Sequence, residues 1–216
     1  MSGEFQRARS REAKQQREQA ILDAAERLAA REGTRLTTLT GIADEIGMHK
    51  SALLRYFETR EQIFLRLTVA GWQEWSAVVV AQLDGSEHPS PEVVATTLVA
   101  TLVARPLFCD LLAEAPLNLE RNVSVEGFRD FKLPVLAEVE RITQAIGRAT
   151  GLDHADADTV LSAAVTLTAG VWQMANPTAE VAALYRSDPR LAHAVIDVES
   201  HVTRMVAAMI RGLPLG

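Results

Sequence analysis

Apolar residues recur at three- and four-residue spacing almost throughout the chain, and no convincing segment alternates with period two. This pattern is typical of helices that bury one face, so it predicts an all-α fold. Gly33, Gly47 and Gly151 follow helical stretches, where glycine commonly ends a helix. About nine helices are expected, over residues 10–31, 38–46, 50–57, 59–83, 91–104, 106–113, 124–150, 155–175 and 189–211.

Residues 38–57 have the pattern of a helix, a tight turn and a second helix. Ile42 and Ile46 face a core from the first helix, and Gly47 provides the turn. The second helix then exposes a polar and basic face of about the size that enters the major groove of DNA. A short helical hairpin with solvated charges has the same periodicity, so the pattern alone leaves both interpretations open. The exposed face consists of His49, Lys50, Ser51, Ala52 and Arg55.

A longer signature of spaced residues surrounds this segment, between about residues 15 and 66. It consists of Ala24-Ala25, Leu28, Gly33, Thr37-Thr38, Ile42-Ala43, Gly47, Leu53, Tyr56-Phe57 and Arg60-Glu61. These residues resemble the N-terminal signature of the tetracycline-repressor (TetR) family. The resemblance implies a one-component transcriptional regulator, usually a repressor, with a three-helix helix-turn-helix domain over residues 1–60. Residues 61–216 would then form a helical domain that binds a small-molecule effector and dimerises.

The resemblance also implies roles for single residues. Thr38 matches a helix cap that can contact phosphate, and Lys50 matches a basic residue near the start of the recognition helix. Tyr56 and Arg60 match phosphate anchors. His49 departs from the family pattern, in which serine is common, and Leu54 replaces a frequent aromatic residue. The expected DNA-binding residues are Thr38, His49, Lys50, Ser51, Ala52, Arg55, Tyr56 and Arg60.

The formal net charge of −6 hides an asymmetry along the chain. Residues 1–60 hold 11 Lys or Arg against 9 Asp or Glu, whereas residues 61–216 hold 11 against 19. Within the first part, Glu12 is the only acidic residue between positions 7 and 17. A solvated tail and a DNA-contacting arm explain this basic segment equally well. Its basic residues are Arg7, Arg9, Arg11, Lys14 and Arg17.

Aromatic residues of the C-terminal part recur at helical spacing, so their first interpretation is a hydrophobic core. A ligand pocket uses the same residue types, and the family resemblance favours that interpretation. Few charges lie among them, which favours a mostly apolar effector, although Arg129, Lys132 or Glu74 could pair with a charged one. The expected pocket residues are Trp72, Trp75, Phe108, Phe128, Phe131 and Trp172.

The helix expected at 155–175 is apolar on nearly every side, so it must be covered all round. Pairing with the last helix in a two-fold symmetric homodimer would cover it, and that symmetry matches a palindromic operator in double-stranded DNA. Burial within one chain is the alternative. The expected interface residues are Leu161, Ala164, Val165, Val171, Val195 and Val202.

The sequence gives little support for a reactive thiol, a metal site or a catalytic site. Cys109 lies among apolar neighbours and is expected to be a packed, unreactive thiol. His154 lies among acidic residues that are better explained as a helix start than as a metal site. No nucleophile, acid–base pair or cofactor motif is recognisable, so no metal, no cofactor and no enzymatic activity are expected. An all-helical enzyme and a DNA-binding module without a ligand remain the alternative functions.

No segment reaches the roughly 20 apolar residues that span a bilayer, and the first 19 residues contain no apolar signal region. With a single cysteine, these features predict a cytoplasmic protein without a membrane anchor.

Overall fold

Helices are the only regular elements in the computed structural model, which describes the backbone of residues 2–214 and the side chains of residues 12–191 and 195–214. No strand occurs in this part of the chain, so the all-α prediction is confirmed. The elements are α1 (Ser2–Glu32), α2 (Leu39–Glu45), α3 (Lys50–Leu53), α4 (Arg60–Asp84), α5 (Pro91–Val103), α6 (Pro106–Leu117), η1 (Leu119–Arg121), α7 (Val125–Thr150), α8 (His154–Ala175), α9 (Ala179–Ser187), η2 (Pro189–Ala194) and α10 (Val198–Gly212).

Side-chain caps fix where five of the longer helices begin. Thr59, Ser90, Ser124, Asp153 and Asp197 each accept a hydrogen bond from the backbone N–H three residues further along the chain. Such a cap satisfies one of the backbone donors that have no partner in the first turn of a helix. These local interactions explain why α4, α5, α7 and α8 begin close to their predicted positions.

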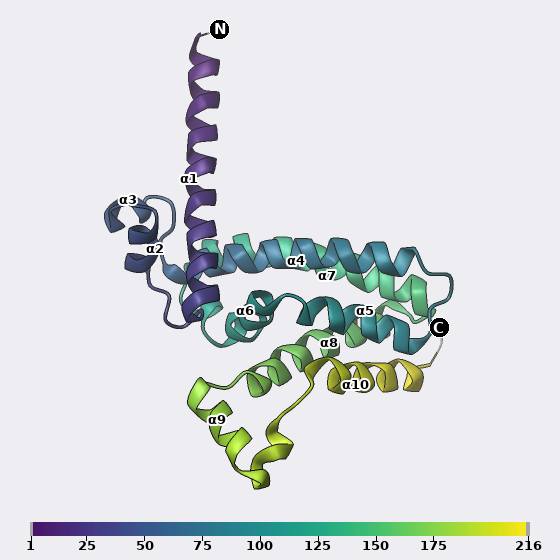
Figure 1. The fold of residues 1–216 in the computed structure, drawn as a ribbon. Helices are drawn as coiled ribbons and strands as arrows, with labels where there is room; N and C mark the ends of the chain where they lie inside the picture. The colour runs from purple at the N-terminus through teal and green to yellow at the C-terminus, as the bar shows by residue number, and fades with distance from the viewer. Residues whose placement is uncertain (1, 215–216) are drawn as a thin grey trace.

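The molecule contains two hydrophobic cores, and residues of α4 belong to both. The smaller core joins α1, α2 and α3 and includes Ile21, Ile42 and Leu53, all fully buried. The larger core is built from α4 to α8 and α10, with α4 packed along α7 and α5 along α10. Figure 1 shows α2 and α3 beside α1 at one end, while α4 runs from there along the larger body. The smaller core therefore carries the helix-turn-helix segment, and α4 connects it to the rest.

Aromatic rings fill the part of the larger core between α4 and α6. The ring of Trp72 meets those of Trp75 and Phe108 edge to face, with centroids 5.4 and 5.8 Å apart. Trp75 Nε1 donates to Thr101 Oγ1 at 2.8 Å, which satisfies its buried polar atom. Phe108 packs directly on Gly71, where a Cβ atom would lie 2.4 Å from the ring. Glycine at position 71 thus allows α6 to approach α4 closely.

The helix bounds differ from the prediction mainly near the C-terminus. The structure contains α9 at Ala179–Ser187, where no helix was expected, and the last helix begins at Val198 instead of residue 189. The described part of the chain therefore holds ten α-helices, not about nine. None of the residues of α9 is buried, so no stripe of core residues marks it in the sequence. The predicted helix at 189–211 joined two separate elements of the structure, the short 3₁₀ helix η2 and α10.

Smaller differences concern three other helices. The first helix begins at Ser2, α3 ends at Leu53, and α6 continues through Pro116 to Leu117. Pro134 lies within α7, which runs unbroken to Thr150.

No single helix of the described residues is both long and apolar enough to cross a membrane. The pair α5 and α6 passes this test only when taken together, and the two helices are bent by 90° at the break between them. Their apolar residues largely face the core.

The buried thiol of Cys109 gives a direct test of the packing between α5 and α6. Its Sγ atom donates to the backbone oxygen of Leu102 at 3.2 Å, and burial, aided by the nearby charge of Asp110, raises its pKa to about 12. Because the thiolate is the reactive form, we expect no reaction of the native protein with a thiol-specific reagent at pH 8. Reaction should become complete after unfolding in guanidinium chloride. Rapid labelling of the native protein would contradict this packing.

Candidate nucleic-acid interface

The segment from Thr38 to Leu53 forms a helix, a turn and a second short helix, as its pattern predicted. Thr38 begins α2, and its Oγ1 accepts from the backbone N–H of Gly41 at 3.0 Å. Gly47 has φ +62°, a left-handed conformation that favours glycine, and so ends α2. After this turn, Met48 N–H donates to the backbone oxygen of Ala43 at 2.8 Å. The fully buried Leu53 then fixes α3 against the smaller core.

The imidazole of His49 caps the start of α3. Its Nδ1 accepts a hydrogen bond from the backbone N–H of Ser51 at 3.3 Å and lies 2.8 Å from the hydroxyl of Ser51. Because Nδ1 is the acceptor, the proton of the neutral ring is on Nε2. His49 is thus the N-cap residue of α3, and its Nε2–H is left as a donor.

The expected DNA-contacting residues of α3 and of the segments next to it differ in exposure. His49, Lys50, Ser51 and Arg55 are exposed, whereas Ala52 and Tyr56 are partly buried. Several of them line a hollow of about 710 Å³ between α1 and α3. The lining residues are Ala13, Lys14, Arg17, Gly47, Met48, His49, Ala52, Arg55 and Tyr56.

Two basic residues of α1 add to this surface. Lys14 and Arg17 are exposed and line the same hollow, opposite Arg55 of the segment after α3. They belong to the basic segment noted in the sequence, but only the fold shows that they face α3. The side chains of Arg7, Arg9 and Arg11 lie outside the described residues. The surface thus combines three basic side chains with the exposed start of a helix, which suits contact with phosphates and base edges.

Arg60 has a different place from the one expected. Its Nε donates to the backbone oxygen of Thr37 at 2.5 Å, its NH2 group donates to that of Thr34, and its NH1 group pairs with Glu61 at 2.9 Å. The guanidinium also lies 4.7 Å from the ring centroid of Phe64. Its side chain is only 16% exposed. Through these partners the guanidinium joins the α1–α2 loop to α4, and the expected phosphate contact of Arg60 stays a prediction.

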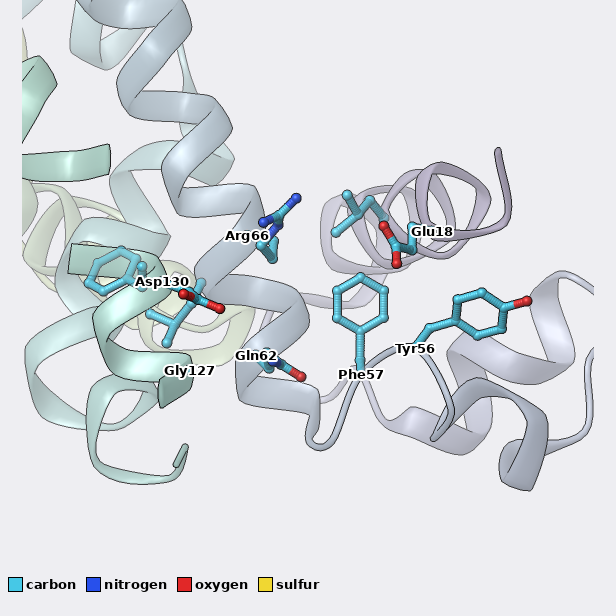
Figure 2. A pocket seen from close by; sticks show the side chains of 10 residues that line it. Glu18, Tyr56, Phe57, Gln62, Arg66, Gly127 and Asp130 are labelled. Carbon is cyan, nitrogen blue, oxygen red and sulfur yellow. The ribbon is translucent and has the colours of Figure 1, made fainter. Parts of the chain in front are cut away.

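A narrow seam separates the helix-turn-helix segment from α7. Figure 2 shows Phe57 pointing towards α1 from the segment before α4, while Tyr56 points away from the seam. Asp130 faces the seam from α7. The hollow there measures only about 120 Å³, too small for a drug-sized ligand. A second connection joins the two parts, because Arg35 Nε donates to Glu114 Oε1 of α6 at 2.6 Å.

The expected pocket residues do not form one cavity. A cavity of about 540 Å³ lies between α4, α6, α7 and α8, and of the six aromatic residues only Trp72 and Phe131 line it. Trp75 and Phe108 lie in the core, and Phe128 is at the surface. Sequence reasoning missed most of the lining because it is aliphatic or polar and has no mark that separates it from core or surface. The other lining residues are Thr68, Leu112, Ala113, Ala115, Pro116, Leu117, Glu120, Lys132, Val135, Val165, Thr166, Ala169, Gly170 and Gln173.

Trp172 lies near this cavity without lining it. Its Nε1 donates to Asp110 Oδ1 at 3.0 Å, and the side-chain amide of Gln173 donates to the same oxygen at 2.8 Å. Asp110 of α6 thereby holds the C-terminal turns of α8 in place.

Half of the expected dimer-interface residues face the interior of their own chain. Leu161 and Ala164 of α8 and Val202 of α10 are at most 2% exposed, because α8 packs against α5, α6, α7 and α10, while α10 packs against α5 and α8. They have no surface left to offer a partner. Val165 and Val171 are partly buried, and Val195 is exposed. The exposed stripe of α8 instead consists of Thr159, Ser162, Thr166, Gly170 and Met174.

The acidic residues around His154 form a helix start, as the sequence suggested. Asp153 caps α8 by accepting from Asp156 N–H at 2.9 Å. His154 Nε2 lies 3.0 Å from a carboxylate oxygen of Glu140, and this contact raises the pKa of the imidazole. Among the described residues, no three His, Cys, Asp or Glu side chains lie close enough together to hold a metal ion.

Comparisons with known families match nearly the whole chain in two parts. Residues 21–67 match the family described as bacterial regulatory proteins, tetR family, and residues 69–215 match the tetracyclin repressor-like C-terminal domain. A search of curated proteins finds no match.

Solved structures with the same fold include three bacterial regulators. A possible TetR family transcriptional regulator from Streptomyces coelicolor A3(2) has a TM-score of 0.61 at 16% identity, covering 90% of this chain and 97% of its own. A tetR family regulatory protein from Rhodococcus RHA1 has a TM-score of 0.57 at 17% identity, with 92% and 97% covered. The fatty acid degradation regulator FadR from Bacillus halodurans has a TM-score of 0.57 at 14% identity, with the same coverage. At these identities the likeness shows the fold alone.

The position of Arg60 leads to a prediction that separates stability from DNA contact. Arg60→Ala leaves two backbone oxygens and a carboxylate without their donor, so we expect the free energy of unfolding to fall by about 1–3 kcal/mol in a urea titration. Arg60→Lys should also destabilise the protein, because an ammonium group cannot reproduce the fork that reaches two carbonyls. Unchanged stability, together with a smaller salt dependence of DNA binding, would show instead that Arg60 contacts phosphate.

Proposed function

Since the chain belongs to the TetR family of bacterial transcriptional regulators, we propose that it binds a palindromic operator as a homodimer and represses transcription until a small-molecule effector releases it. The observation that carries this proposal is the surface around α3. Lys50 is exposed in α3, while Arg55, just after this helix, lines one hollow together with Lys14 and Arg17 of α1. Helix N-termini and cationic side chains bind phosphates, while exposed polar side chains of a recognition helix read base edges.

We propose that α3 enters the major groove while α1 follows the phosphate backbone. Lys50 can donate hydrogen bonds to the edge of a guanine, and the methyl group of Ala52 can make an apolar contact with the methyl group of a thymine. Thr38, at the start of α2, is exposed and can reach phosphate in addition to capping its helix. In this arrangement Lys14 and Arg17 supply affinity that is independent of sequence, as phosphate contacts do.

For the dimer, we propose that the exposed faces of α8 and α10 meet those of a second copy. The exposed stripe of α8 is made largely of small residues, and Gly170 has open space where a side chain would project. Small residues let helices approach closely. A two-fold symmetric dimer would present two α3 helices about 34–36 Å apart, or a multiple of that distance, as a palindromic site requires.

We propose a division into a DNA-binding domain at residues 1–60 and an effector-binding and dimerisation domain at residues 61–216. The first turn of α4 serves both, because Ile63 packs in the smaller core. Effector binding in the 540 Å³ cavity is expected to act on α6, which lines it with residues 112, 113 and 115–117. On the same helix, Glu114 bonds Arg35 next to the helix-turn-helix segment.

The coupling between effector and operator needs only a modest free energy. Suppose that the effector prefers a dimer conformation in which the spacing of the two α3 helices does not fit the operator. A preference of about 1–3 kcal/mol over the operator-binding conformation would weaken operator binding roughly 5- to 150-fold. Operator DNA must then weaken effector binding by the same factor. This regulation would take place in the cytoplasm, where operator DNA is found, and without an enzymatic step.

The two alternative functions have less support. A DNA-binding module without a ligand would have no need of a cavity of this size lined mainly by apolar residues. An enzyme would need a constellation of nucleophile, acid and base, and the clusters described above serve as helix caps and surface ion pairs instead.

A selection of genomic fragments with the purified protein should yield a palindromic site, and variants then test the interface by mobility shift. Lys50→Ala is expected to weaken binding to the selected site by about 1–3 kcal/mol and to relax its specificity. Arg17→Ala should weaken binding to all sequences and reduce the slope of log affinity against log salt by about one. Arg129→Ala, an exposed arginine of α7, serves as the control. If Lys50→Ala and Arg17→Ala both behave like the control, α3 is not the DNA-contacting element.

A charged substitution on the exposed stripe of α8 tests the dimer. Ser162→Arg places a long cation where we expect a second α8, so light scattering at micromolar concentration should show a monomer. The monomer should keep its helical content, because Ser162 is exposed in the single chain. Ala77→Arg, on the exposed side of α4, is the matched control and should remain dimeric. A dimer that persists unchanged in Ser162→Arg would place the interface elsewhere.

A further inference from the structure

The residues that line the cavity between α4, α6, α7 and α8 indicate the chemical nature of the molecule that it can bind. Its walls are mainly apolar, with Trp72 and Phe131 as the aromatic members and Leu112, Val135 and Val165 among the aliphatic ones. An apolar wall of this extent accommodates the body of a molecule that is mostly hydrocarbon.

Two charged side chains line the cavity, and they pair with each other. Lys132 Nζ of α7 lies 2.9 Å from Glu120 Oε1 of η1. Of the other charged residues considered from the sequence, Glu74 and Arg129 do not line it. A bound molecule that reaches this pair must therefore compete with one of its two partners.

The surroundings of the pair favour replacement of the carboxylate. The ammonium of Lys132 lies 5.3 Å from the ring centroid of Phe131 and 5.5 Å from that of Phe128, and both rings stabilise a cation. A cationic ligand would have to displace Lys132 from both rings. An anionic ligand would displace only Glu120, whose side chain is 18% exposed and belongs to a short 3₁₀ helix next to the exposed residues Arg121 and Asn122.

We infer that the effector is an amphiphile with an apolar body and one anionic head, such as a carboxylate, which takes the place of Glu120 beside Lys132. This inference rests on the proposed function only in treating the cavity as the effector site. The hydrocarbon body fills the space between α4 and α8, and the head lies at the α7–η1 side. Lys132 is then the residue that selects the charge of the ligand, and Glu120 is the internal carboxylate with which the ligand head competes.

Calorimetry with three probes tests this assignment. Decanoate, decanol and decylamine have the same ten-carbon chain and differ only in the head group. A flexible ten-carbon chain adapts to the shape of the cavity, so the head alone is compared. Decanoate should bind the unmodified protein most tightly. Lys132→Met should weaken decanoate at least about tenfold and leave decanol nearly unchanged, whereas Glu120→Gln should strengthen decanoate. Arg129→Met removes a charge from the exposed side of the same helix and should change none of these affinities.

Several outcomes would overturn the inference. These are the absence of binding by all three probes, equal binding of all three, a preference for decylamine that Glu120→Gln abolishes, or unchanged decanoate affinity in Lys132→Met. Thermal unfolding of each variant without probe shows whether the fold is intact. Failure of the proposed function is a separate result: decanoate that binds through Lys132 but has the same affinity with and without operator DNA would remove the proposed release and leave the head-group assignment in place.

Discussion

The beginning of α4 is the constraint on which the rest of the structure depends, because this single helix is buried in two cores at once. Ile63 packs with α1, α2 and α3, while the next residues, Phe64 and Leu65, pack in the larger core. Thr59 caps the helix, and Arg60 bonds the carbonyls of the α1–α2 loop. The helix-turn-helix segment therefore cannot shift without moving the first turns of α4 or breaking these bonds.

A second route between the two parts runs through α6. One side of this helix lines the cavity between α4, α6, α7 and α8, and Glu114 on the same helix bonds Arg35 in the loop before α2. Glu114 is 8% exposed, so water is largely excluded from the carboxylate side of the ion pair, whereas the Arg35 side chain is exposed. Any molecule that changes the position of α6 acts on the DNA-binding surface through this pair as well as through α4.

Residue type predicted the kind of surface better than it predicted the partner of each side chain. Arg60 is basic and close to the recognition helix, yet its donors are used within the chain. Ala164 is small and apolar, as an interface residue would be, yet α8 turns it towards the core. Trp75 and Phe128 were both expected to line the ligand pocket, yet Trp75 lies in the core and Phe128 at the surface. A linear pattern gives burial on one face but does not show which neighbour covers it.

The sequence alone determined the helical class, most helix starts and the helix-turn-helix, because these follow from contacts within four residues: caps such as Thr38, the left-handed Gly47 and the spacing of apolar positions. It also pointed to the TetR family through residues clustered in one stretch. Only the tertiary structure decided that Lys14 and Arg17 face α3, that Arg60 closes a junction, and that Lys132 meets Glu120 beside an apolar cavity. These relations join residues that the packing of separate helices brings together, and no local rule of spacing encodes that packing.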